Sequence, residues 1–403
     1  MKSIPYKIAF FFYHAIIRPV LNLFILIVSV ILILVCCLIS RYRSQKAFDI
    51  GLGPDPLINN FYHKKALELF GYKAHTFVTH TFYQTQEFDF ISFRDLNRFI
   101  HLWWGNYYVF MLSVWRYKCI YIYFNGGALY PTALWRWEPL LYKLARVKVV
   151  VLAYGGDVQD MSRSRSLVFK HVHAMDYPRH KLNRKRTSEQ IDLWTKYASH
   201  VLGGCEWVDY MHGWDTLLLA HFTIDTEMWK PLNTDGEKND KTFKIFHAPN
   251  HKNIKGTRFF VDAVDELKKE GYDVELMIVQ GVPNNKMKEK IMEADIIADQ
   301  LIVGWYAMFA IEAMSMCKPV ICYLREDLEN LYITAGLIKK DEIPIINCDC
   351  LSVKEKIKSL MENRDSLKDI GLRSREYVKK HHSIEYIGSV FDKINKKIGV
   401  RNN

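Results

Sequence analysis

The cysteines of this sequence form no pattern that would bind a metal or build a disulfide scaffold. There are eight, of which Cys36 and Cys37 lie in an apolar run near the N-terminus, while Cys348 and Cys350 make a lone C-x-C pair. No group has the spacing of zinc ligands, and none resembles the disulfide framework of a small secreted domain. We therefore expect buried, reduced thiols in the cytosol and no metal site.

The sequence also lacks internal repeats and low-complexity segments, which excludes solenoid and fibrous architectures. Hydrophobic residues make up 49% and aromatic residues 14% of the chain, enough to build true cores. With 403 residues the chain is too long for one ordinary domain, so two domains are expected.

A nucleic-acid-binding motif is missing as well, although the net charge is +11. The cations are concentrated at residues 163–186, where eight Lys and Arg residues are opposed by a single acid, Asp176. Without a recognition motif, nucleic acid is not an expected partner. Anionic lipid head groups or a pyrophosphate-bearing acceptor suit the segment better, and an ordinary solvated face is the alternative.

Residues 19–40 form a long stretch without any charge. An α-helix of that length, at about 1.5 Å per residue, just crosses the hydrocarbon core of a bilayer. A cleaved signal peptide is a poorer interpretation, because the run is long and lacks a small-residue cleavage site. Basic residues flank both ends, so the positive-inside rule does not choose an orientation. We predict that residues 1–45 are a membrane anchor and that the rest lies on the cytoplasmic side of the cell membrane.

After the anchor, the pattern is that of a βαβ opening. Residues 48–55 indicate a strand that ends in a glycine loop, followed by a helix at 57–70 and a strand at 72–79. Residues 187–190 (TSEQ) have capping-box spacing and predict the start of a helix that runs to Tyr197. Further strands, each leading into or ending in a glycine pair, are expected at 119–124, 147–154 and 199–203.

Residues 233–242 are polar, contain glycine and lack aliphatic side chains, so they mark a boundary. After them strands and helices alternate again, with strands expected at 243–247, 274–279, 296–303, 319–324 and 343–346. We predict an α/β protein with two doubly wound, Rossmann-like domains that face a cleft. The first domain is placed at 46–235, the second at 240–380, and a C-terminal helix and tail at 381–403.

The segment 304–323 predicts a site for a phosphate. It has the pattern of a tight turn, a short apolar helix with one carboxylate (Glu312) and a Lys-Pro step into a buried strand. The backbone N–H groups around Ala307, Met308 and Phe309, together with the positive end of the helix dipole, suit an anion. Glu312 stands less than two turns into the helix, within reach of the ribose of the same ligand. The pattern indicates the donor half of a nucleotide-sugar site.

These residues resemble glycosyltransferase family 4 and its relatives with the GT-B fold. The resemblance is specific over residues 243–328, through the segments HAPNHKNIKGT (247–257), ADIIADQLIV (294–303) and GWYAMFAIEAMSMCKPV (304–320). It is weaker through the first domain and does not cover the anchor. It implies transfer of a sugar from a nucleotide-sugar donor to an acceptor with retention of anomeric configuration, without a metal or another cofactor. It assigns the donor to the second domain and the acceptor to the first.

The resemblance carries over to the donor site unevenly. Family members often carry two glutamates with seven residues between them; Glu312 matches the second, which binds the ribose, whereas Gly304 stands at the first. Lys255 matches the lysine that contacts the donor phosphates, and the family arginine falls at Asn250. Asp299 is the nearest acid upstream of Gly304, but its expected strand position argues against its being a replacement. The predicted donor-binding residues are Asn250, His251, Lys252, Lys255, Ala307, Met308, Phe309 and Glu312.

In the first domain the family often shows His-Gly-x-Asp after a strand, and this chain has Tyr-Gly-Gly-Asp at 154–157. Asp157 fits the acid, while Tyr154 stands where the histidine would be. The predicted catalytic residues are Asp157, Lys255 and Glu312. The predicted acceptor-binding residues are Gly51, Gly53, Gly126, Gly127 and Asp157, with ordinary turn chemistry as the alternative for the glycines.

The sequence therefore predicts a membrane-anchored glycosyltransferase that acts on a lipid-linked saccharide or glycolipid, in the synthesis of cell-envelope polysaccharide or glycolipid. A soluble acceptor is the alternative for the substrate. A second class stays open: a GT-B scaffold without catalysis, or a partner subunit of another transferase. Gly304, Asn250 and Tyr154 favour this class, because each replaces a family residue.

Overall fold

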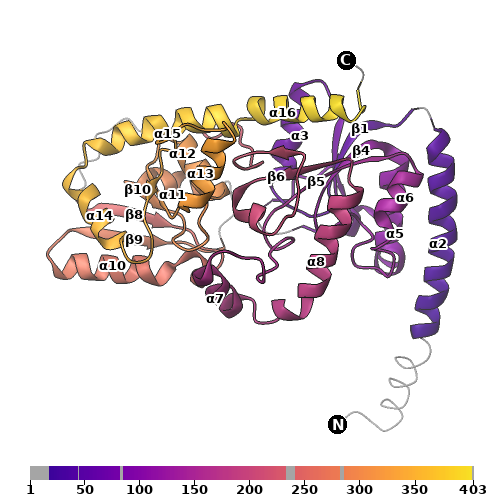
Figure 1. The fold of residues 1–403 in the computed structure, drawn as a ribbon, viewed down its shortest axis with the longest axis horizontal. Helices are drawn as coiled ribbons and strands as arrows, with labels where there is room; N and C mark the ends of the chain where they lie inside the picture. The colour runs from indigo at the N-terminus through magenta and orange to yellow at the C-terminus, as the bar shows by residue number, and fades with distance from the viewer. Residues whose placement is uncertain (1–17, 44, 82–84, 233–240, 282–285, 402–403) are drawn as a thin grey trace, which may run out of the picture.

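The computed structural model describes residues 18–43, 45–81, 85–232, 241–281 and 286–401. Within them lie two parallel β-sheets, each covered by helices, that stand side by side in the long direction of the molecule (Figure 1). We call the part built on the first sheet the first lobe and the part built on the second sheet the second lobe. The predicted α/β class with two Rossmann-like sheets is confirmed.

The first sheet has seven strands in the order β3-β2-β1-β4-β5-β6-β7. Every strand pairing is parallel, and the first six follow the doubly wound order in which the chain starts in the middle and reverses between β1 and β4. The strands are β1 (Phe48–Leu52), β2 (Ala74–Val78), β3 (Phe90–Ile91), β4 (Tyr117–Tyr123), β5 (Lys148–Leu152), β6 (His200–Gly203) and β7 (Thr216–Leu217).

The helices of the first lobe differ from the sequence prediction at one clear point. Residues 187–190 do not open a helix, because α8 already begins at His180 and runs to Tyr197. Thr187 and Gln190 are buried on the inner face of this helix, so packing against the lobe outweighs the local capping pattern. The other helical segments are α3 (Asn59–Leu69), α4 (Ser92–Asp95), α5 (Arg98–Arg116), α6 (Glu138–Leu144), α7 (Leu167–Asp176) and the 3-10 turn η2 (Cys205–Asp209).

The second sheet has five parallel strands in the order β12-β11-β10-β8-β9. Its strands are β8 (Phe243–His247), β9 (Val274–Ile278), β10 (Ile296–Ala298), β11 (Val320–Cys322) and β12 (Ile346–Asn347). Its helices are α9 (Lys252–Lys255), α10 (Thr257–Lys269), α11 (Met287–Glu293), α12 (Met308–Ser315), α13 (Glu326–Thr334), α14 (Val353–Glu362) and α15 (Ser366–His382).

The C-terminal helix α16 (Ile384–Lys397) leaves the second lobe and packs on the first (Figure 1). Ile387 and Phe391 join the core cluster that contains Ile50 of β1. Tyr72 donates a hydrogen bond to Asp392 at 2.9 Å, which ties the helix to the loop after α3. This crossover joins the two lobes at a second place in addition to the linker, most of which lies outside the described residues. The domain limits at 46–235, 240–380 and 381–403 stay predictions.

The second lobe differs from the sequence prediction at two points. The strand expected at 296–303 stops at Ala298, because the next side chain, Asp299, turns to bind Lys255 and a backbone N–H of the loop that follows. Helix α15, which was not predicted, lies between α14 and α16 in the sequence. It packs on α12, the short helix of the predicted phosphate site.

Of the described helices, α2 (Arg18–Tyr42) alone is long and apolar enough to cross a membrane. It stands beside α5 and α6 at the edge of the first lobe (Figure 1). The first 17 residues of the predicted anchor lie outside the described part of the chain.

Candidate donor site between the two lobes

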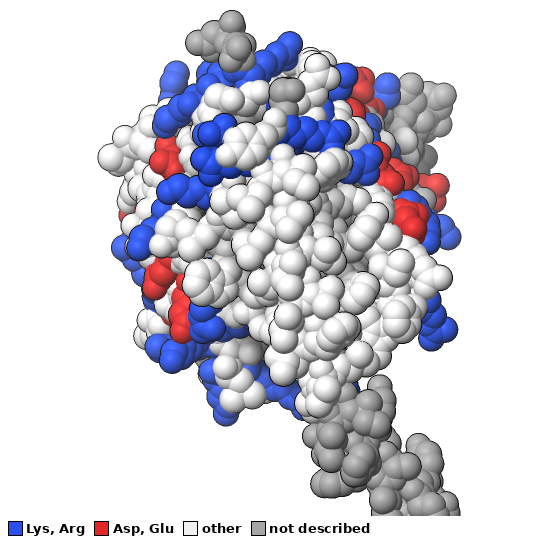
Figure 2. All heavy atoms as spheres, turned by 90° about the vertical axis from the view of Figure 1, so that its right-hand side faces the viewer, with Lys and Arg blue, Asp and Glu red and all other residues white. Residues whose placement is uncertain are grey.

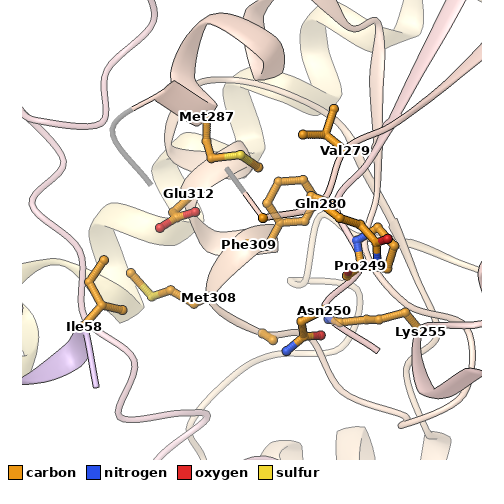
Figure 3. A pocket seen from close by; sticks show the side chains of 13 residues that line it. Ile58, Pro249, Asn250, Lys255, Val279, Gln280, Met287, Met308, Phe309 and Glu312 are labelled. Atoms are coloured by element: carbon orange, nitrogen blue, oxygen red, sulfur yellow. Dashed lines mark hydrogen bonds between the residues drawn. The ribbon is translucent and has the colours of Figure 1, made fainter. Parts of the chain in front are cut away.

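A pocket lies at the carboxyl ends of β8 and β9, at the amino end of α12, and reaches the first lobe at Ile58 (Figure 3). In the second sheet the strand order reverses at β8, which has β9 on one side and β10 on the other. Open α/β sheets bind their ligands outside the carboxyl ends of the strands at such a reversal. The pocket is lined by Ile58, Ala248, Pro249, Asn250, Lys255, Val279, Gln280, Gly281, Met287, Ala307, Met308, Phe309 and Glu312.

Six of the eight predicted donor residues line this pocket. Lys255 and Asn250 lie on one side of it, Glu312 lies on the other, and the ring of Phe309 lies between them (Figure 3). A cation and a carboxylate on opposite sides of one pocket match two parts of a nucleoside diphosphate: the anionic phosphates and the ribose, which carries hydroxyl donors.

Lys255 is the last residue of the short helix α9 and is held by an acid. Its Nζ lies 2.8 Å from Oδ1 of Asp299, and the lysine side chain is only 12% exposed while the aspartate side chain is fully buried. Gly256 follows with a φ of 73°, which ends α9 and lets α10 begin in a new direction. An ammonium group has three protons, so one bond to Asp299 leaves Lys255 able to bind a phosphate as well.

Asp299 also binds the loop that leads into α12. Its Oδ2 accepts a hydrogen bond from the backbone N–H of Ala307 at 3.2 Å. One carboxylate therefore links the predicted phosphate lysine to the amino end of the predicted phosphate helix. The sequence predicted a strand over Asp299 and therefore no role for it in the donor site. A carboxylate directly after a buried strand was the signal that could have identified this residue.

The missing first glutamate has a structural explanation. Gly304 has a φ of 96°, and a Cβ atom at this position would lie 2.5 Å from Cγ and Cδ of Arg325. Arg325 is held there by Asp209 of the first lobe, whose two oxygens lie 2.6 and 3.2 Å from its guanidinium nitrogens. No side chain fits at Gly304 unless Arg325 moves.

Glu312 is a buried carboxylate on the second turn of α12. It is close enough to Tyr62 of α3 to help raise the pKa of that phenol, although burial is the larger cause. Burial lowers the pKa of Lys288, and the negative charge of Glu312 partly offsets this shift. Glu312 therefore acts electrostatically on Tyr62 of the first lobe and on Lys288 of α11.

The remaining two predicted donor residues, His251 and Lys252, do not line the pocket. His251 instead meets α7 of the first lobe, with its Nε2 2.5 Å from the hydroxyl of Tyr177. Asp176, one residue earlier, accepts hydrogen bonds from the Asn253 amide at 2.6 Å and from the Ile254 N–H at 3.1 Å. The first lobe therefore caps α9 and fixes the loop that carries Lys255.

Asp157 lies at the carboxyl end of β5 and is buried. Its two oxygens accept three backbone hydrogen bonds, from Phe124 at 3.0 Å, from Tyr154 at 3.0 Å and from Gly155 at 2.9 Å. Burial raises its pKa to about 7, although these backbone bonds oppose the shift. Asp157 thus joins the loops after β4 and β5.

A second carboxyl group, Asp55, lies near Asp157 and was not singled out from the sequence. Burial raises its pKa to about 7, the charge of Asp157 adds to the shift, and the Asn125 side chain opposes it. Its Oδ2 is buried without a hydrogen-bond partner. The signal was present, because an acid that directly follows a strand and a glycine loop lies at the ligand-binding edge of a parallel sheet.

The four glycines predicted to bind the acceptor pack against the protein itself. A Cβ at Gly51 would lie 2.4 Å from the Tyr117 ring, and one at Gly53 would lie 1.8 Å from the Phe77 carbonyl oxygen. At Gly126 and Gly127 the space is filled by the buried carboxylate of Glu138, which accepts the N–H of Gly127. None of the four lines the pocket.

In the described part of the chain, no three His, Cys, Asp or Glu side chains converge in a way that could hold a metal ion. The comparisons with known proteins give structures alone: no protein-family model and no curated protein sequence matches the chain.

Several solved structures share the arrangement of both lobes over nearly their whole length. Sucrose-phosphate synthase from Thermosynechococcus elongatus matches 87% of this chain and 99% of its own, with 13% identity and a TM-score of 0.56. Anabaena HepE, solved in complex with UDP, matches 88% of this chain and 100% of its own at 12% identity and a TM-score of 0.55. A glycosyltransferase from Rickettsia africae matches 89% of this chain and all of its own at 12% identity and a TM-score of 0.53.

The chain has the GT-B fold. The predicted fold is therefore confirmed, including two facing Rossmann-like lobes. In this GT-B chain the crossover helix α16 and the buried pair of Arg325 and Asp209 hold the two lobes together. At identities of 12 and 13%, the comparisons show the fold, and the roles of single residues stay predictions.

Proposed function

We propose that this protein transfers a sugar from a nucleotide-sugar donor to a lipid-linked saccharide or glycolipid, in the synthesis of cell-envelope polysaccharide or glycolipid. The observation that carries the proposal is the pocket itself: Lys255, the amino end of α12 and Glu312 converge where the second sheet reverses its strand order. The UDP complex of HepE, which has the same fold, supports a nucleotide in such a pocket.

The proposed chemistry follows from where charge develops. Breaking the sugar–phosphate bond leaves negative charge on the nucleoside diphosphate, and fixed donors aimed at that charge lower the barrier. Lys255, oriented by Asp299, and the first-turn N–H groups of α12 supply those donors. Glu312 accepts hydrogen bonds from the ribose hydroxyls. No metal or further cofactor is required by this scheme.

The first lobe contributes the acceptor side in this proposal. Retention of configuration requires the acceptor hydroxyl to attack from the face of the leaving group, so the departing phosphate can take its proton. Asp157, whose oxygens are occupied by backbone N–H groups, then holds the loops after β4 and β5 in place rather than touching the reactants. Helix α2 would keep the protein beside a lipid-linked acceptor at the cytoplasmic face of the membrane.

Thermal unfolding with a panel of nucleoside diphosphates and nucleotide sugars tests the donor site. A ligand that binds only the folded chain raises its melting temperature, so UDP, GDP or ADP should each be compared with the matching nucleotide sugar. Glu312→Gln should remove most of the shift, because an amide is a weaker acceptor for ribose hydroxyls. Glu355→Gln is the matched control, since Glu355 is exposed on α14. A panel without any shift in the wild-type chain would overturn the proposal.

A scaffold without catalysis is the second candidate, and Gly304 favours it, because no carboxylate fits at that position while Arg325 stays in place. Slow hydrolysis of a radiolabelled nucleotide sugar separates the two. Turnover supports the transferase if Lys255→Ala abolishes it and the control Lys354→Ala on α14 does not. A chain that binds the nucleotide sugar but does not hydrolyse it supports the scaffold.

A further inference from the structure

Helix α2 is packed along the first lobe rather than standing free of it. Its buried residues Ile25, Ser29, Ile33, Cys37 and Ser40 recur every three or four positions, so one face is covered over most of its length. Ile33 and Cys37 belong to the same core cluster as Val109 and Val114 of α5. The Ser40 hydroxyl donates to the Val114 carbonyl at 2.8 Å.

The opposite face of α2 is exposed and apolar. Figure 2 looks onto this side of the molecule and shows a broad surface without charges, with Lys and Arg side chains along its upper margin. Soluble monomers rarely leave a patch of this size in water. The exposed apolar residues are Val20, Leu21, Leu23, Phe24, Ile27, Ile31, Leu32, Leu34, Val35, Leu38 and Ile39 of α2 and Phe99, Ile100, Leu102, Tyr108 and Trp115 of α5.

The charges of this region have one sign. No Asp or Glu occurs at residues 18–48 or 96–137, which contain α2, α5 and the loops beside them. The cations stand at the helix ends: Arg41 lies in the last turn of α2, Arg43 follows this helix, and Arg98 and Arg116 are the first and last residues of α5. Arg43 lies 4.4 Å above the half-exposed ring of Trp115. An apolar face with cations and aromatic rings at its margin is complementary to a bilayer that contains anionic lipid.

The packing determines how α2 can meet that bilayer. From Ile25 to Ser40 the covered stretch is about 22 Å long, most of the thickness of a hydrocarbon core. If α2 crossed the membrane in this arrangement, α5 would lie in the core beside it. Helix α5 runs straight into β4, where Lys118 pairs with Asp49 of β1 at 2.7 Å. That charged pair, at the amino ends of two central strands, would then have to enter or border the hydrocarbon, at a cost of several kcal/mol.

We propose that α2 and α5 form one membrane-docking face that lies in the plane of an anionic bilayer, and that α2 does not cross the bilayer. The inference rests on the membrane association proposed above and specifies its geometry. With α2 in the plane, the first lobe sits directly on the lipid surface, and its ligand-binding edge can reach the head group of a membrane-bound acceptor.

Depth measurement along α2 tests the proposal. Phe24, Ile31 and Leu38 lie seven residues apart on one exposed face. Each is changed to cysteine in the full chain with its native cysteines replaced by alanine, spin-labelled and bound to vesicles of phosphatidylcholine with 30% phosphatidylglycerol. In the plane, all three labels should lie at one shallow depth of about 5–10 Å. A label at Leu351, which is 91% exposed in the second lobe, is the control and should report no lipid.

A spanning helix would give a different result. Ile31 would then lie deepest, about 10 Å deeper than Phe24 and Leu38, which would stand about 21 Å apart along the membrane normal near opposite surfaces, and this outcome overturns the proposal. Equal exposure of all labels to water would also overturn it and would indicate a protein partner or a second copy on this face. If the cysteine-free chain does not fold, the same positions can carry a genetically encoded fluorophore read with brominated lipids.

A charge variant gives a second measurement. Ile31→Glu/Leu38→Glu should lower the vesicle partition coefficient about tenfold or more, whereas Leu351→Glu/Leu372→Glu should leave it unchanged. The nucleotide-induced thermal shift should be the same in both variants. Loss of vesicle binding with an intact nucleotide shift separates this surface from the donor site, so either proposal can fail without the other.

Discussion

Arg325 at the start of α13 and Asp209 at the end of η2 form a buried, two-point ion pair between the lobes, with nitrogen–oxygen distances of 2.6 and 3.2 Å. The side chains are 7% and 2% exposed. The same guanidinium pairs with Asp327 at 2.6 Å, and the aliphatic part of the Arg325 side chain covers Gly304. A single side chain thus joins the lobes and fills the space beside Gly304.

Removing Arg325 should destabilise the chain strongly. Arg325→Met leaves the buried charge of Asp209 with the Arg165 backbone N–H at 3.3 Å and the exposed Arg165 side chain at 3.9 Å, and breaking such a buried pair costs about 3–5 kcal/mol. Urea unfolding followed by tryptophan fluorescence measures the change. Arg373→Met, which breaks an exposed pair on α15, is the control and should cost less than about 1 kcal/mol. Equal effects of the two variants would contradict a structural role for the interlobe pair.

Adding a side chain at Gly304 should cost more than the backbone conformation explains. Gly304→Ala forces a Cβ against Arg325, whereas Gly336→Ala places one in open space at a similarly positive φ of 70°. Both variants carry a strain of about 1 kcal/mol, so the difference between them reports the clash. Calorimetric melting temperatures provide the measurement. We expect Gly304→Ala to melt clearly lower, and a smaller loss than in Gly336→Ala would show that Arg325 moves aside freely.

Asp176 should support nucleotide binding from outside the pocket. It caps α9 across the lobes, and losing such a cap costs about 1 kcal/mol. If that cost is passed on to Lys255, Asp176→Ala should weaken nucleoside diphosphate binding roughly fivefold in isothermal titration. Asp369→Ala, an exposed aspartate on α15, serves as the reference. Unchanged affinity in Asp176→Ala would mean that α9 keeps its geometry without the first lobe.

The two buried carboxyl groups of the first lobe should make stability depend on pH. The folded-state pKa of Asp55 is raised to about 7 from 3.8, so the chain gains stability from its protonated form below pH 4 and loses that gain as the pH rises through 7. Asp55→Asn cannot ionise and should therefore become the more stable chain by several degrees above pH 7.

Melting temperatures between pH 4 and 8.5 test this dependence. The difference in melting temperature between the wild type and Asp55→Asn should grow as the pH rises from 4 to 7 and level off above that. Asp262→Asn, at an exposed position of α10, should run parallel to the wild type. A constant difference between the wild type and Asp55→Asn would show that Asp55 is ionised throughout.

The fold could be predicted from the sequence because its signals are local. Strands at 48–52, 117–123 and 243–247 are apolar runs that end in glycine or polar loops, and the helices between them have one apolar face. Glu312 was found for the same reason, since it stands at a fixed distance from a helix end, whereas Lys255 was found through the family resemblance of its segment. Where local signals compete with packing they mislead, as in the capping pattern at 187–190, which lies inside α8.

The sequence by itself determined two parallel α/β lobes, a phosphate-compatible helix end in the second and an uncharged helix before the first. Only the tertiary structure decided that Asp299 holds Lys255, that Arg325 fills the space at Gly304 and that α2 lies against α5. These contacts join residues that are 44, 21 and 74 positions apart in the sequence, in the order given. Composition and periodicity report what a residue requires of its neighbours along the chain, whereas such contacts depend on strand order and lobe orientation, which no short segment encodes.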